Sequence, residues 1–188
     1  MFFRILLRIP ILRKIPRQPE VRNRYFFARQ NLCARELCMN GTAKQVVFHL
    51  DGQRFGIPID LVERIIHAVE VNVVPNTTEH VLGVINVEGT IVPVLNVRRL
   101  FGLPGRDVTP DEQIVIVSVQ NRTAALVVDN VTGLVELSPG EVMERESPVP
   151  GAGYVSGISR GDDGIIFLCA MQRLIDHEEI VALGGALV

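Results

Sequence analysis

The sequence contains no tryptophan and few other aromatic residues. Aromatic residues make up 5% of its 188 residues, although 47% of the residues are hydrophobic. Valine, isoleucine and leucine must therefore supply most of the core, and this composition favours strands. The scarcity of aromatic side chains also counts against a surface that stacks on nucleic-acid bases. The length suits one domain or two small subdomains that share a core.

The sequence also lacks the features of disulfide-stabilised, secreted or membrane-spanning proteins. Its three cysteines, Cys33, Cys38 and Cys169, do not make a disulfide framework, and we expect Cys169 to be a buried free thiol. No apolar run reaches the roughly 18 residues that span a bilayer. Arg4 and Arg8 interrupt the apolar N-terminal stretch, and no small-residue cleavage site follows it. We therefore expect a cytoplasmic protein with no direct membrane span.

No pattern in the sequence points to catalysis or to metal binding. The four histidines lack metal-ligand spacing, and no phosphate-loop or nucleophile-elbow motif occurs. Asp162-Asp163 lies in a glycine-flanked turn, where aspartate is favoured for turn geometry. We interpret Arg98-Arg99 as a solvated helix face and Asp129 as a strand-end residue, either solvated or paired with Arg99. The prediction is a protein that is not an enzyme, with no catalytic residue, no metal and no cofactor.

The net charge of −2 hides a division between two regions. Residues 1–38 contain nine basic and two acidic residues, and residues 39–188 contain ten basic and nineteen acidic residues, which gives +7 and −9. An acidic body argues against nucleic acid as the partner, because phosphate binding needs a basic face. Three interpretations of residues 1–38 are open: a disordered or weakly amphipathic basic arm, a peripheral membrane anchor, or a start-site artefact with the true start at Met39. The sharp change in composition favours the third, and we place the folded domain at residues 39–188.

From Gln45 onward, short apolar segments alternate with turn residues, as is typical of a β-barrel or a β-sandwich. Asn96 is expected to cap a short helix, and another helix is expected to begin at Met171. Residues 114–117 are apolar at consecutive positions, so both faces of that strand must be covered, as in two barrels packed together. The predicted strands are residues 45–50, 54–57, 81–87, 90–95, 113–119, 123–129, 131–137, 154–159 and 165–168. A helical turn is expected at residues 60–64, followed by an extended segment at residues 64–74.

The most informative segment is VLGVINVEGTIVPVLNVRRLFGL at residues 81–103, which reads as strand, Glu-Gly turn, strand and short helix. Its spaced positions are Gly83, Asn86, Gly89, Pro93, Arg98 and Gly102. The segment resembles the signature hairpin of the CheW family, the adaptors that join bacterial chemoreceptors to the histidine kinase CheA. Three further segments, FGIPIDLVERI, LVVDNVTGLVEL and IIFLCAMQRLI, extend the resemblance over residues 45–183.

The resemblance implies an all-β fold of two small five-stranded β-barrels packed together, with short helices after the signature hairpin and near the C-terminus. It also implies a non-catalytic scaffold in chemotaxis-like signal transduction. The partners would be the regulatory domain of a CheA-like kinase and the cytoplasmic tip of a chemoreceptor. The receptor-binding positions would be Val62, Gly83 and Glu88, and the kinase-binding positions Gly89 and Leu174. A small β-barrel that binds nucleic acid is the alternative, against which the acidic body counts.

The sequence departs from the family pattern at Glu88, where relatives commonly carry arginine. A reversed charge at a docking position should change the choice of partner. We therefore expect a receptor or kinase that offers a complementary basic residue to Glu88.

Overall fold

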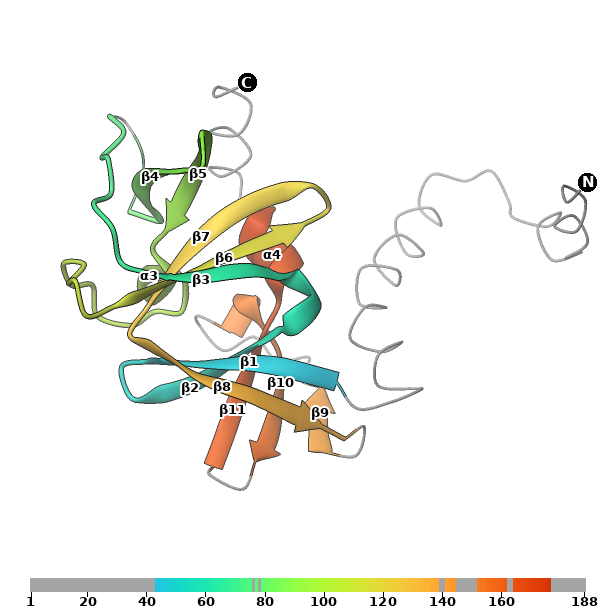
Figure 1. Cartoon of the computed structure of the whole chain (residues 1–188). Helices are drawn as coiled ribbons and strands as arrows, with labels where there is room; N and C mark the ends of the chain where they lie inside the picture. The colour runs from blue at the N-terminus through green and yellow to red at the C-terminus, as the bar shows by residue number, and fades with distance from the viewer. Residues whose placement is uncertain are drawn as a thin grey trace, which may run out of the picture. The chain divides into compact units, whose positions relative to one another are not determined.

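The computed structural model describes residues 43–75, 77, 79–138, 141–144, 152–161 and 164–176. These residues form two β-sheets and a few short helical segments (Figure 1). The predicted arm at residues 1–38 and the pair Asp162-Asp163 lie outside the described residues, as does any continuation of the C-terminal helix beyond residue 176. Within the described residues, no helix has the length and apolar character needed to cross a membrane.

The first sheet has six strands in the order β8-β1-β2-β11-β10-β9. They are β1 (Ala43–Leu50), β2 (Gln53–Pro58), β8 (Asn130–Leu137), β9 (Val142–Glu144), β10 (Val155–Gly161) and β11 (Gly164–Cys169). The edge strands β8 and β9 are joined by residues 138–141 alone. Five Cα-to-Cα steps span at most about 18 Å, whereas six strands in a flat sheet are about 24 Å wide. The first sheet must therefore curl to bring its two edges together.

The second sheet has five strands in the order β3-β6-β7-β5-β4. They are β3 (Val62–His67), β4 (Val81–Val87), β5 (Thr90–Leu95), β6 (Gln113–Val119) and β7 (Arg122–Val128). The chain that follows β3 runs on to the opposite edge of this sheet. There, the backbone N–H of Asn72 donates to Val84 O, and the N–H of Val84 donates to Asn72 O, each at 2.9 Å. This antiparallel bridge links the two edges of the second sheet.

The two sheets share one apolar core, to which the helices α3 (Val97–Leu100) and α4 (Met171–Ile175) also contribute. Val115 and Val117 of β6 belong to this shared core, whereas Ile114 and Ile116 belong to a second cluster within the five-stranded sheet. Successive residues of a strand point to opposite faces, so β6 is buried on both faces. The prediction made from the consecutive apolar positions of residues 114–117 is therefore confirmed.

The predicted fold class is confirmed, and most observed strands follow the predicted ones closely. The exception is β3, which covers Val62–His67, where a helical turn to residue 64 and an extended segment from 64 to 74 were expected. The signature hairpin occupies Val81–Val87 and Thr90–Leu95, as its apolar runs and turn residues indicated. The first sheet has six strands where five were expected, because the short strand β9 adds to its edge. Two 3₁₀ turns, η2 (Ile59–Leu61) and η4 (Ala152–Tyr154), complete the elements.

Candidate docking surface and its supporting polar cluster

The turn between β4 and β5 presents Glu88 and Gly89 to solvent. Both residues adopt positive φ angles, 51° at Glu88 and 90° at Gly89, as hairpin turns of two residues commonly require. The backbone N–H of Gly89 donates to Asn86 Oδ1 at 2.8 Å, which fixes the turn from within. The signature hairpin thus places two of the predicted contact positions at one exposed tip.

Glu88 forms a bidentate ion pair with Arg64 of β3. Arg64 Nη1 donates to Glu88 Oε1 at 2.7 Å, and Arg64 Nη2 donates to Glu88 Oε2 at 3.2 Å. This hydrogen bonding lowers the pKa of Glu88 and raises the pKa of Arg64, and the attraction between the charges adds to both shifts. The pair joins the β4–β5 turn to β3, so it links the same two sheet edges as the Asn72 bridge. No local pattern in the sequence indicated a contact between positions 24 residues apart.

Val62 and Gly83, the other predicted receptor-binding positions, lie on the same two edge strands. Val62 begins β3 and is half-buried against the shared core. Gly83 is buried in β4 with φ at 148°, and a Cβ atom there would lie 2.2 Å from Asn72 O. Gly83 therefore permits the backbone bridge that supports this surface, and its contact with a receptor stays a prediction.

Leu174, predicted as a kinase-binding position, is fully buried in α4. Its side chain belongs to the shared core, so it is not available to a partner. The apolar stripe of this helix faces the protein's own interior, which is the usual position of such a stripe in a short surface helix. The prediction that the Leu174 side chain contacts the kinase is therefore wrong, because this side chain is part of the core. The adjacent residue Arg173 is exposed.

The Leu174→Ala variant should lose roughly 3 kcal/mol of folding free energy, because it removes buried methyl groups and leaves a cavity. Urea denaturation of this variant and of Arg173→Ala, which changes an exposed side chain of the same helix, measures the difference. Any loss of kinase binding by Leu174→Ala should be proportional to the fraction of the variant that is unfolded. Lost binding at unchanged stability would contradict the core assignment.

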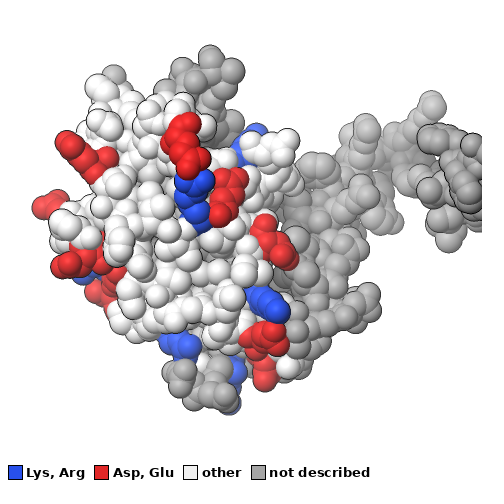
Figure 2. All heavy atoms as spheres, in the orientation of Figure 1, with Lys and Arg blue, Asp and Glu red and all other residues white. Residues whose placement is uncertain are grey.

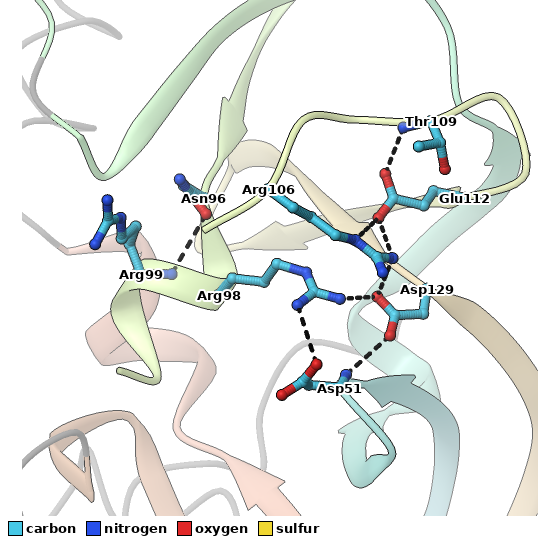
Figure 3. Close-up of polar contacts among 8 residues, drawn as sticks. All are labelled: Asp51, Asn96, Arg98, Arg99, Arg106, Thr109, Glu112 and Asp129. Carbon is cyan, nitrogen blue, oxygen red and sulfur yellow. Dashed lines mark hydrogen bonds and ion pairs between the residues drawn. The ribbon is translucent and has the colours of Figure 1, made fainter. Parts of the chain in front are cut away.

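A cluster of charged side chains lies beside α3, where the ends of both sheets meet (Figure 3). Asp129, which follows β7, is its centre. Asp129 Oδ1 accepts hydrogen bonds from Arg98 Nη2 at 2.5 Å and from Arg106 Nη2 at 2.9 Å. Asp129 Oδ2 accepts from the backbone N–H of Asp51, in the β1–β2 turn, at 2.8 Å. One carboxylate thus holds α3, the loop after it and a turn of the other sheet together.

Glu112 is a second, buried carboxylate in this cluster. Its Oε1 accepts from Arg106 Nη2 at 2.6 Å, and its Oε2 accepts from the backbone N–H of Thr109 at 2.8 Å. The hydrogen bonding of Arg106 to the Glu112 carboxylate raises the pKa of Arg106. Glu112 therefore fixes the loop that carries Arg106 toward Asp129.

The interpretation of Arg98 as a solvated residue is wrong, because its side chain is 8% exposed and bound to Asp129. Arg99 is exposed and pairs with Glu79 at 3.5 Å. Successive helix residues point about 100° apart, which lets Arg98 face the interior while Arg99 faces solvent. Asp129 pairs with Arg98 and Arg106, where the sequence had suggested Arg99 or solvent.

The carboxylates of this cluster accept hydrogen bonds from the protein's own groups. Within this part of the chain, no group of three or more His, Cys, Asp or Glu side chains could hold a metal ion. The carboxylates of Glu112 and Asp129 are instead occupied by arginines and backbone N–H groups. Cys169 is a buried free thiol, as predicted, and its burial raises its pKa.

Comparison with known proteins identifies the family of this chain. The family model of the CheW-like domain matches residues 44–179. The chain belongs to the CheW family. The chemotaxis protein CheW of Klebsiella aerogenes is 25% identical over 141 residues, which cover 72% of this chain and 82% of that protein. The CheW protein of Thermotoga maritima is 26% identical over 138 residues, which cover 73% of this chain and 89% of that protein.

A solved structure supports the same assignment. The crystal structure of the scaffolding protein TtCheW from Thermoanaerobacter tengcongensis is similar, with a TM-score of 0.63 and 30% identity. The match covers 68% of this chain and 88% of TtCheW. The predicted function, a scaffold in chemotaxis-like signalling, is confirmed, and the family is one of non-catalytic scaffolds.

The nucleic-acid alternative gains no support from these relatives. On the face drawn in Figure 2, the basic side chains are scattered among the acidic ones and do not gather into one patch. A nucleic-acid site needs basic groups gathered along one face. The described charges on this face therefore suit a protein partner better.

Proposed function

We propose that this chain is a cytoplasmic adaptor that couples a chemoreceptor to a CheA-like histidine kinase. Its action is positional, because it holds the regulatory domain of the kinase in a fixed geometry beside the receptor tip. The observation that carries this proposal is the exposed β4–β5 turn of a CheW-family domain, which the Asn86 side chain and the Asn72–Val84 backbone bridge hold in place. A binding surface held rigidly before association loses less entropy when it docks.

The receptor side of this surface comprises Val62 and Glu88, with Gly83 shaping the backbone beneath it. Half-buried Val62, at the start of β3, offers some apolar area, and Glu88 offers an exposed charge that is paired with Arg64 of the same strand. Apolar area beside a polar rim suits the amphipathic helices of a receptor's hairpin tip. A change at Glu88 should therefore act on receptor binding first.

The kinase side includes Gly89, where the absence of a side chain permits close approach of a partner's backbone. A Cβ atom at Gly89 would meet nothing within 4 Å in the chain itself. We expect Gly89→Asp to weaken kinase binding about tenfold, because the new side chain and charge occupy the interface. Titration of the kinase's regulatory domain with the full chain measures this loss, and receptor binding should be spared.

Gly164→Asp is the matched control for Gly89→Asp. Gly164 also has a positive φ, 115°, and a Cβ atom there would meet nothing within 4 Å, but Gly164 begins the strand β11 of the other sheet. Both variants carry similar backbone strain, so a difference between their affinities for the kinase reports on the position of the new side chain. Equal weakening by the two variants, or loss of receptor and kinase binding together, would contradict the kinase side proposed here.

The proposed function as a whole is tested with the unaltered chain. The full chain should form a complex with the regulatory domain of the CheA-like kinase from its own organism, and the complex should also bind receptor tips. If the full chain fails to bind the kinase domain, or the complex fails to bind receptor tips, at millimolar concentration, the proposal is wrong.

A further inference from the structure

The Arg64–Glu88 ion pair is better placed to be recognised than to stabilise the fold. The side chain of Arg64 is 44% exposed and that of Glu88 is 75% exposed. Exposed ion pairs contribute little to folding free energy, because water screens them and ordering the side chains costs entropy. Its geometry is nevertheless well defined, with two parallel hydrogen bonds between guanidinium and carboxylate.

Holding the two sheet edges together does not require this particular order of charges. The backbone bridge between Asn72 and Val84 already links the edges. An acidic residue on β3 and a basic residue at the turn could form the same bidentate pair. The fold therefore does not require the carboxylate to be at the exposed turn, and its position there can instead determine which partner binds.

We propose that this order of charges selects the receptor, and that the receptor tip offers a lysine or arginine to the Glu88 carboxylate. The inference rests on the proposed adaptor function. Arg64 binds one side of each Glu88 oxygen, and each oxygen retains a lone pair for a further donor. A basic residue of the partner gains a charge-assisted hydrogen bond there, while an acidic residue is repelled.

A single charge reversal does not test this inference cleanly. Glu88→Arg places a second guanidinium against Arg64, so repulsion within the chain is added to any effect on the partner. The double variant Arg64→Glu/Glu88→Arg retains an ion pair at the same position and reverses only the order of its charges. The cross-strand pair Lys44–Glu136, at 3.2 Å on the other sheet, supplies the matched control as Lys44→Glu/Glu136→Lys.

The experiment measures binding of the full chain to two receptor probes. One is the cytoplasmic hairpin-tip fragment of a chemoreceptor from the chain's own organism, and the other is the same fragment with its tip lysines and arginines changed to glutamate. The unaltered chain and the Lys44/Glu136 control should prefer the first probe by about tenfold at low salt. The Arg64/Glu88 double variant should prefer the second probe, with unchanged affinity for the kinase's regulatory domain.

The outcomes separate this inference from the adaptor function. If the double variant folds, binds the kinase and retains the unaltered chain's preference, the selecting role of the pair is wrong and the adaptor function stands. If no form of the chain binds either probe or the kinase, both proposals fall. Melting temperatures of all forms, compared with that of the unaltered chain, identify any variant whose folding has changed.

Discussion

Replacing Gly83 with alanine should destabilise the protein by roughly 3–5 kcal/mol, from overpacking and backbone strain together. The new Cβ atom would lie 2.2 Å from Asn72 O, which is a backbone atom and cannot rotate away. The φ angle of 148° at Gly83 adds strain for any residue with a side chain. Relieving the clash requires breaking the two hydrogen bonds between Asn72 and Val84.

Gly133→Ala is the matched control for this prediction. Gly133 of β8 has a φ of 140°, close to that of Gly83, but its Cβ would meet nothing within 4 Å. The two variants share the strain, so the difference between their urea midpoints measures the clash alone. Hydrogen exchange at the Val84 amide should accelerate in Gly83→Ala only. Equal destabilisation by the two variants would show that moving Asn72 away from position 83 does not lower the free energy of unfolding, and would contradict this prediction.

The Asp129→Asn variant should lose roughly 2–4 kcal/mol of folding free energy, because it leaves the nearly buried Arg98 without its main counter-charge. The remaining carboxylate near Arg98 is that of Asp51, at 3.7 Å from Arg98 Nη1. The amide also puts an NH2 group, which can only donate, in place of one carboxylate oxygen, so either the two arginines or the Asp51 N–H lose their acceptor. Thermal and urea unfolding of the full chain measure the loss.

Two further variants test whether the loss comes from the buried pair. Glu136→Gln breaks an exposed pair with Lys44 and should change stability by less than about 0.5 kcal/mol. Arg98→Met should be less destabilising in the Asp129→Asn background than alone, because the two residues interact directly. Additive effects of Arg98→Met and Asp129→Asn would contradict the pairing.

Much of the local structure follows from short patterns of residues. Glu88-Gly89, between two apolar runs, indicated the signature hairpin, and the turn has the positive φ angles that such hairpins need. Asn96 caps α3 as predicted, with its Oδ1 accepting from the Arg99 N–H at 3.3 Å. These features depend on neighbours within a few residues, so the sequence carries them directly.

The apolar composition of residues 114–117 also determined that β6 is buried on both faces. Residues 114–117 and Cys169 were predicted as interior positions from apolar character alone, and both lie in the core. Burial of this kind depends on the free energy of removing apolar surface from water, which each residue carries with it. The sequence thus determined the all-β class, the order of hairpins and most of the core.

Only the tertiary structure decided how distant segments meet. The parallel pairs β2–β11 and β5–β7, the Arg64–Glu88 pair and the Asp129 cluster join residues with no shared local pattern. Leu174 faces inward for the same reason, since an apolar stripe shows that a face is covered but not by what. Such contacts depend on which edges and helix faces the folded chain brings together, and no single segment encodes that arrangement.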